Sequence, residues 1–265
     1  MYVTANGIRI RYEITGQGPV LVLIHGFSDN FHMWFNQVPA FCRERTVLTY
    51  DVRGFGESDK RGPYSMGVFA EDLYELLRAL GIGSACVLGY SMGGRIGLHL
   101  TFRHPDIVTG LIFANSGVGA KITPESEARW RMMTEVIETG DREAIAEMMA
   151  LGSFSPGFKE KDPTTFQRYK EIKMENDPAP YLEILRAMMA DTTQLADLQR
   201  VSCPTLIIVG EKDSFMDVEL GGAMRDALPA ADLVVLPSGH AAALEVPAAF
   251  NEAVLAFFNR LHGRL

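Results

Sequence analysis

The sequence predicts an α/β fold in which helices cover both faces of a mostly parallel sheet. Two observations support this class. Short apolar runs alternate along the chain with segments of helical periodicity, and the runs are apolar almost throughout. Strands that helices bury on both faces have this continuous apolar character. The repeated strand–helix order also favours parallel strands joined by right-handed crossovers.

The expected strands and helices follow in order from the N-terminus. Apolar and polar residues alternate over Ile8–Glu13, which predicts an antiparallel edge hairpin. Buried strands are expected at Val20–Ile24, Thr46–Tyr50, Ala85–Leu88, Val108–Phe113, Thr205–Val209 and Leu233–Leu236. Helices are expected at Met66–Leu80, Met92–Arg103, Glu219–Ala227 and Ala248–Leu261.

The segment from Gly117 to Leu195 interrupts this alternation, because it contains helical pieces but no strand run. Methionine is concentrated there, at Met132, Met133, Met148, Met149, Met174, Met188 and Met189. Methionine adapts to varied shapes, so these residues either fill helix–helix contacts or line a binding cavity. We expect residues 1–116 and 196–265 to form one discontinuous core, with residues 117–195 inserted as a helical cap.

Composition argues against several classes of protein. The 265 residues carry 33 acidic and 25 basic side chains, a formal net charge of −8, and no Lys/Arg stripe that would bind a nucleic acid. The cysteines Cys42, Cys86 and Cys203 are far apart, so neither a disulfide framework nor a thiolate zinc site is expected. No apolar run approaches the roughly 20 residues of a membrane span, and the first residues do not resemble a signal peptide. We therefore expect a cytoplasmic protein without a membrane partner.

A candidate nucleophile lies in Gly89-Tyr90-Ser91-Met92-Gly93, a G-x-S-x-G sequence. It follows one expected strand and opens the next expected helix, which is the strand–turn–helix setting of a nucleophile elbow. Such a turn exposes the serine Oγ beside a helix N-terminus, where negative charge is favoured. The alternative is a glycine-rich turn without chemistry.

A serine hydroxyl needs a base, and the base needs an orienting carboxylate. Of the six histidines, His240 is the one that follows an expected strand at the carboxyl end of the sheet, where such folds bind ligands. Asp213 follows the preceding strand at the same edge. Weaker carboxylate candidates are Glu211, Asp217 and Glu219. The chain order Ser91, Asp213, His240 is that of strand-elbow hydrolases.

Two backbone amides are the expected oxyanion donors. His25-Gly26-Phe27 follows a strand, and its glycine allows the backbone to turn its amides inward. We expect the N–H groups of Phe27 and Met92 to bind the oxyanion, with His25 bracing the loop. No G-x-G-x-x-G and no Walker-type lysine motif occurs, so a phosphate-binding role is not expected.

Together these motifs resemble those of the α/β-hydrolase superfamily. They are His25-Gly26-Phe27, Asp51-x-Arg53-Gly54-x-Gly56-x-Ser58, Gly89-Tyr90-Ser91-Met92-Gly93-Gly94, Gly210-x-x-Asp213 and Ser238-Gly239-His240. The resemblance implies an eight-stranded α/β-hydrolase sheet and a helical cap over residues 117–195. Within the superfamily the pattern is similar to carboxylesterases, enol-lactonases and metal-free perhydrolases called haloperoxidases. It implies a catalytic core that uses no cofactor and no metal and takes a small ester or lactone.

Other members of the superfamily define the alternatives. Ser91 departs from the aspartate nucleophile of haloalkane dehalogenases and epoxide hydrolases. C–C bond hydrolases usually carry a Gly-Pro-Gly-type oxyanion loop, which this chain lacks. Residues 90–95 also resemble the menaquinone-pathway lyase. The expected cap shows no clear set of arginines for the dianionic substrate of that lyase, although Arg129, Arg131 and Arg168 are available. A further alternative, from another class, is a small-molecule receptor with a slow triad.

The expected pocket is apolar. Trp130, Phe154 and Phe158 are close in sequence to the cap methionines, and together they indicate a pocket for an apolar acyl or alcohol group. The sequence does not indicate an oligomeric state.

Overall fold

An eight-stranded sheet forms the centre of the computed structural model, which describes residues 1–119 and 123–262. The strand order is β1-β2-β4-β3-β5-β6-β7-β8. Their bounds are β1 (Tyr2–Ala5), β2 (Ile8–Thr15), β3 (Val20–Ile24), β4 (Thr46–Tyr50), β5 (Ala85–Tyr90), β6 (Val108–Ala114), β7 (Thr205–Gly210) and β8 (Ala231–Leu236). The first two strands are antiparallel to their neighbours, and β3 to β8 are parallel. The predicted fold class and the predicted edge hairpin are confirmed.

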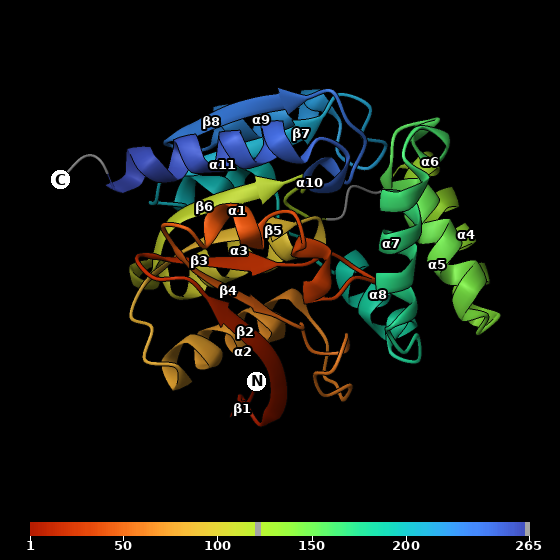
Figure 1. Ribbon diagram of the computed structural model, residues 1–265, viewed down its shortest axis with the longest axis horizontal. Helices are drawn as coiled ribbons and strands as arrows, with labels where there is room; N and C mark the ends of the chain where they lie inside the picture. The colour runs from red at the N-terminus through yellow and green to blue at the C-terminus, as the bar shows by residue number, and fades with distance from the viewer. Residues whose placement is uncertain (120–122, 263–265) are drawn as a thin grey trace.

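Helices cover both faces of this sheet (Figure 1). Those between or after the strands are α1 (Val38–Phe41), α2 (Met66–Ala79), α3 (Met92–Arg103), α9 (Val218–Ala227), α10 (Ala242–Glu245) and α11 (Pro247–His262), with 3₁₀ turns η1 (Phe31–Trp34), η2 (Pro105–Ile107) and η3 (Leu195–Arg200). Each of the four helices expected from the sequence is present, and its bounds agree within one residue.

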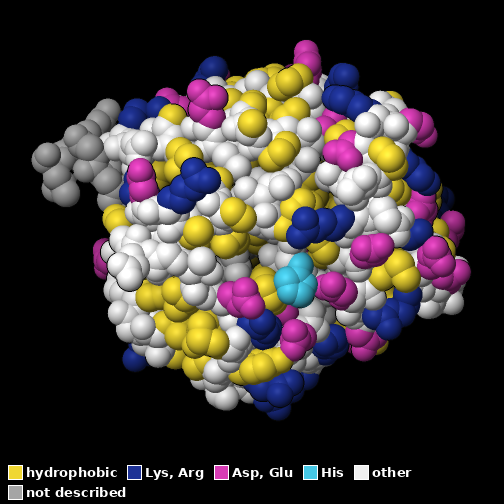
Figure 2. All heavy atoms as spheres, in the orientation of Figure 1, with side chains coloured by type: hydrophobic (Ala, Val, Ile, Leu, Met, Phe, Trp, Pro, Cys, Tyr) yellow, Lys and Arg dark blue, Asp and Glu magenta, His cyan; other side chains and the backbone are white. Residues whose placement is uncertain are grey.

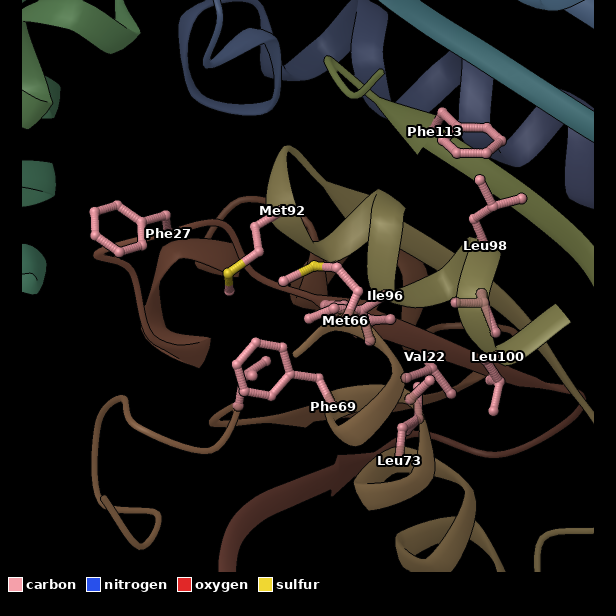
Figure 3. Packing of buried hydrophobic residues seen from close by; sticks show 14 of the residues in the cluster. Val22, Phe27, Met66, Phe69, Leu73, Met92, Ile96, Leu98, Leu100 and Phe113 are labelled. Atoms are coloured by element: carbon pink, nitrogen blue, oxygen red, sulfur yellow. The ribbon is translucent and has the colours of Figure 1, made fainter. Parts of the chain in front are cut away.

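Two apolar clusters form the core, one on each face of the sheet. Along β3, Val22 and Ile24 belong to the cluster beneath α2, α3 and α9, whereas Leu21 and Leu23 belong to the cluster beneath α1 and α11. This division follows from the alternation of side chains along a strand. Figure 3 shows the first cluster, in which Val22 lies among side chains from α2 and α3.

Between β6 and η3 the described residues form five helices: α4 (Pro124–Glu138), α5 (Arg142–Ser153), α6 (Phe158–Lys161), α7 (Pro163–Met174) and α8 (Tyr181–Met189). They lie together at one end of the sheet, in green on the right of Figure 1. The described residues between β6 and η3 contain no strand, which agrees with the expected helical insertion. The boundaries 1–116, 117–195 and 196–265 stay a prediction.

The surface and the cysteines complete the description. On the face seen in Figure 2, basic and acidic side chains are interspersed. Cys42, Cys86 and Cys203 are free thiols. None of the helices in residues 1–119 and 123–262 is both long enough and apolar enough to cross a membrane.

The sheet core gives a direct test of the fold. Leu111 in β6 is fully buried, so Leu111→Ala should lower the free energy of unfolding by about 2–5 kcal/mol through lost burial and the cavity left behind. Leu151→Ala is the matched control, because that leucine is half exposed on α5. Urea unfolding followed by circular dichroism measures both. Equal losses for the two variants would contradict the layer arrangement.

Candidate active site

Ser91 occupies a strained turn between β5 and α3. Its φ of 52° and ψ of −116° lie in a region that residues other than glycine rarely adopt. Both flanking glycines are sterically required, since a Cβ on Gly93 would overlap the carbonyl of Ile24 in β3 and one on Gly89 would overlap the backbone of Gly93. The turn therefore packs against the neighbouring strand and presents Ser91 to a cavity at the carboxyl ends of the strands.

The structure brings Ser91, His240 and Asp213 into one chain of hydrogen bonds. His240 Nε2 lies 3.0 Å from Ser91 Oγ, and His240 Nδ1 lies 2.8 Å from Asp213 Oδ2. With the proton on Nδ1, the ring donates to the carboxylate and Nε2 accepts from the serine hydroxyl. The imidazole packs against the rings of Tyr90 and Phe215, at centroid distances of 5.2 and 4.7 Å.

Asp213 is held as a carboxylate by several donors. Burial opposes its ionisation, but the neighbouring His240 and the donated hydrogen bonds keep the pKa of Asp213 below its usual value. The N–H groups of Phe215 and Met216 donate to Oδ1 at 2.8 and 3.1 Å, and Asn115 Nδ2 donates to Oδ2 at 3.0 Å. The ionised form can therefore hold the histidine tautomer described above.

Asn115 is a site residue that the sequence reasoning missed. It directly follows β6, is buried, has a φ of 52°, and also donates to the carbonyl of Gly239 beside His240. The adjacent Ser116 donates from Oγ to the carbonyl of Ser91 at 2.6 Å. Polar residues directly after a buried strand, at the same edge as Asp213, were the available signal.

The expected oxyanion donors are the backbone amides of Phe27 and Met92. Phe27 and Met92 line the same cavity as Ser91, and Figure 3 labels both where they meet the apolar cluster. Met92 is the first residue of α3, so its N–H has no partner within the helix. His25 is buried, places Nδ1 2.8 Å from the carbonyl of Gly26, and accepts from the N–H of Val52 at 2.9 Å. The imidazole thus contacts the backbone of its own loop and that of the segment after β4, which fits the expected bracing role.

The weaker carboxylate candidates lie elsewhere. Glu211 and Glu219 are exposed, and Asp217 caps α9 by accepting from the N–H of Leu220 at 2.6 Å. Only Asp213, of the four carboxylates considered, has a hydrogen bond to His240 in the described residues.

An apolar cavity of about 390 Å³ opens in front of Ser91. Methionines dominate its wall: Met92, Met132, Met133, Met148, Met149, Met188 and Met216. Trp130 is also part of the wall, as expected. The expectation for Phe154 and Phe158 was wrong, because neither lines the cavity. They stack on each other at 4.3 Å, and Phe154 packs against Phe166 and against Tyr169, which does line it.

The cationic groups at the cavity differ from those expected. Of the three arginines considered, Arg129 lines the cavity, whereas Arg131 is exposed and Arg168 lies over the ring of Phe35. Two further cations, unforeseen from the sequence, also line it. Arg95 pairs with Asp191 at 2.9 Å, and Lys173 pairs with Asp29 at 2.6 Å. Among the described residues no group of three or more His, Cys, Asp or Glu side chains is arranged to hold a metal ion.

Comparisons with a family model, with curated relatives and with a solved structure all find hydrolases. A family model described as alpha/beta hydrolase fold matches residues 19–247. The 3-oxoadipate enol-lactonase 2 of Acinetobacter baylyi is 31% identical, over 98% of this chain and 97% of its own length. A 2-hydroxy-6-oxo-6-(2'-aminophenyl)hexa-2,4-dienoic acid hydrolase of Metapseudomonas resinovorans is 26% identical, over 98% of this chain and 90% of its own. A solved thermophilic esterase of Thermogutta terrifontis superposes with a TM-score of 0.90 at 28% identity, covering 99% of this chain and 98% of that one.

The low pKa of Asp213 predicts a pH-dependent contribution to stability. A carboxyl whose folded-state pKa is depressed stabilises the protein above its unfolded pKa of about 3.9, and this contribution is lost as the pH falls through the folded value. The difference in unfolding free energy between wild type and Asp213→Asn should therefore shrink as the pH falls below about 4. Urea titrations across this range measure it.

The exposed Asp226→Asn serves as the control, and should change stability by only about 0–1 kcal/mol because its partner Arg225 is also exposed. A wild-type advantage over Asp213→Asn that grew as the pH fell below about 4 would contradict the assignment.

Proposed function

The chain belongs to the alpha/beta hydrolase fold family, and from this premise we propose that it is a serine hydrolase that cleaves small carboxylic esters or lactones. The observation that carries the proposal is the hydrogen-bond chain from Ser91 through His240 to Asp213. At its Ser91 end this chain faces an apolar cavity. The relatives named as an enol-lactonase and an esterase support the same reaction class.

Acylation begins when Ser91 Oγ attacks the substrate carbonyl carbon. His240 Nε2 takes the hydroxyl proton, and the Asp213 carboxylate stabilises the resulting imidazolium through Nδ1–H. The carbonyl oxygen becomes an oxyanion that accepts from the N–H groups of Phe27 and Met92. When the intermediate collapses, the carbon–oxygen bond to the alcohol breaks and the imidazolium protonates the departing alkoxide. The product is an ester of Ser91.

Deacylation repeats these steps with water as the nucleophile. His240 takes a proton from the water as it attacks the acyl carbon, and the same two amides hold the oxyanion. Collapse returns the proton to Ser91 Oγ and releases the carboxylic acid. With a lactone the alcohol stays attached to the acyl chain, so the product is one ring-opened hydroxy acid. An enol-lactone instead releases an enol acid, which tautomerises to the keto acid.

The cavity favours a small and partly apolar substrate. Its volume of about 390 Å³ and its wall of thioether and aromatic side chains suit a short acyl chain or a compact ring. We propose that residues 117–195 act as the cap that supplies about half of this wall. The methionines from α4, α5 and α8 give it an adaptable surface.

Hydrolysis of a carbon–carbon bond is a second candidate on the same triad. The relative named as a hydroxy-oxo-dienoic acid hydrolase favours it. A panel of esters, lactones and vinylogous diketones, compared by kcat/KM, decides between the two. Higher kcat/KM for the diketones would replace the ester proposal. Lyase activity of the menaquinone-pathway type would appear as substrate loss without uptake of water.

The nucleophile is tested with Ser91→Ala. This variant should lose about 10³-fold or more in the rate of p-nitrophenyl acetate and butyrate hydrolysis, because the covalent route is removed. A fluorophosphonate probe should label the wild type and not the variant. Ser84→Ala is the matched control, since that serine is exposed before β5, at the opposite end of the sheet.

Ester hydrolysis by Ser91→Ala at the wild-type rate would show that Ser91 is not the nucleophile. The receptor alternative makes a different prediction: one equivalent of product per Ser91, without continued release. Sustained release over many turnovers supports the enzyme.

The methionine wall predicts how acyl-chain preference can be changed. Met149 on α5 lines the cavity, so Met149→Trp should reduce its volume and lower kcat/KM for butyrate and hexanoate esters at least several-fold more than for acetate. Met189→Trp is the control because Met189 is exposed on α8 and not part of the wall. The ratio of butyrate to acetate hydrolysis measures the effect. Equal ratios in both variants would place the acyl group elsewhere.

A further inference from the structure

The segment Gly26–Asn30 after β3, here called the oxyanion loop, is bound by the last turns of α7. Asp29 forms an ion pair with Lys173, whose Nζ lies 2.6 Å from Oδ1. The same Nζ donates to Ser28 Oγ at 3.0 Å. The side chains of Lys173 and Asp29 are 2% and 1% exposed, so the pair is shielded from bulk solvent.

Neighbouring residues on both segments extend the contact. Asn176 Nδ2 donates to the carbonyl of Ser28 at 3.0 Å. Asn30 Nδ2 donates to Glu175 Oε2 at 2.8 Å and to the carbonyl of Ile172 at 3.2 Å. Three successive residues of the oxyanion loop are therefore bonded to residues 172–176, more than 140 positions away in the chain.

The oxyanion loop needs such support because part of it is strained. Ser28 has a φ of 64°, in the left-handed region that favours glycine. Phe27 lies between this strained residue and β3, and Asp29 turns back to donate its N–H to the carbonyl of Gly26 at 3.3 Å. Phe27 is therefore held from both directions along the chain. Strand β3 fixes the residues before it, and the contacts to α7 fix the residues after it.

We propose that Lys173 is a positioning residue for the oxyanion hole: through Asp29 and Ser28 it lets α7 hold the oxyanion loop with the N–H of Phe27 directed at the cavity. The inference rests on the proposed function, since Phe27 acts as a donor only in that reaction. Lys173 acts through the loop and not on the reacting atoms. Helix α7 then becomes part of the catalytic apparatus as well as part of a cap.

The test removes the ion pair without leaving a buried charge. Loss of one partner alone would strand the other in the protein interior and could unfold it, so the variant is the double change Lys173→Met with Asp29→Asn. Lys170→Met is the matched control, because Lys170 lies on the same helix but pairs with Glu143 and Glu147. The wild type, the double variant and the Lys170→Met control are compared by kcat and KM for p-nitrophenyl butyrate. Hydrogen exchange of the backbone amides of residues 26–31 is the second readout.

The double variant should lose at least 10-fold in kcat with KM within about 2-fold, since an oxyanion donor acts in the transition state. Exchange in residues 26–31 should be faster than in the wild type, and the Lys170→Met control should change in neither readout. A lower Tm with wild-type kcat would show that Lys173 only stabilises the fold, and would overturn the proposal. A raised KM with unchanged kcat would make it a substrate contact and also overturn it.

The exchange measurement separates this inference from the proposed function. It requires no turnover, so unchanged exchange in residues 26–31 of the double variant overturns the anchoring even in an inactive protein. Failure of the ester reaction itself is detected by the Ser91→Ala comparison and by absent probe labelling.

Discussion

The parallel register of the central strands is the constraint on which the candidate site depends. Across five neighbouring strands one row of paired residues runs Ile24, Gly89, Phe113, Ile207 and Leu233. From that row the chain continues by only two to seven residues to Phe27, Ser91, Asn115, Asp213 and His240. Groups from five distant parts of the sequence therefore meet at one edge without any long loop to position them. A slip of one residue in any pairing would turn its side chains to the other face and separate them.

How far the sequence predicts the structure differs between the sheet and the inserted helices. Strands such as β3 are apolar on both faces, so their positions and the residues that follow them could be read directly. In the inserted helices periodicity identifies an apolar side but not what it contacts, which is why Phe154 and Phe158 were misplaced. The role of Lys173 was equally inaccessible, because its partner Asp29 lies 144 residues earlier and no local pattern links them. Asn115 was within reach, since it follows a strand that had been recognised.

Two buried ion pairs join the inserted helices to the sheet side of the molecule. Arg95, on the helix that begins directly after Ser91, binds Asp191 after α8, and Lys173 on α7 binds Asp29. Charges taken out of water gain little net stability from pairing, but they strongly disfavour any arrangement that separates them. Such pairs therefore determine the position of the inserted helices more than they add to the stability of the fold. The methionine wall supplies apolar contact without comparable directionality.

The seven thioethers in the cavity wall have a chemical consequence of their own. Peroxides convert methionine to its sulfoxide, a polar and chiral group, whereas the serine, histidine and aspartate of the site have no comparable oxidation step. Oxidative conditions would thus change the polarity of the wall while leaving the hydrogen-bond chain intact. Methionine sulfoxide reductases can reverse this change, so in the proposed esterase the preference for apolar acyl groups would depend on the oxidation state of these side chains.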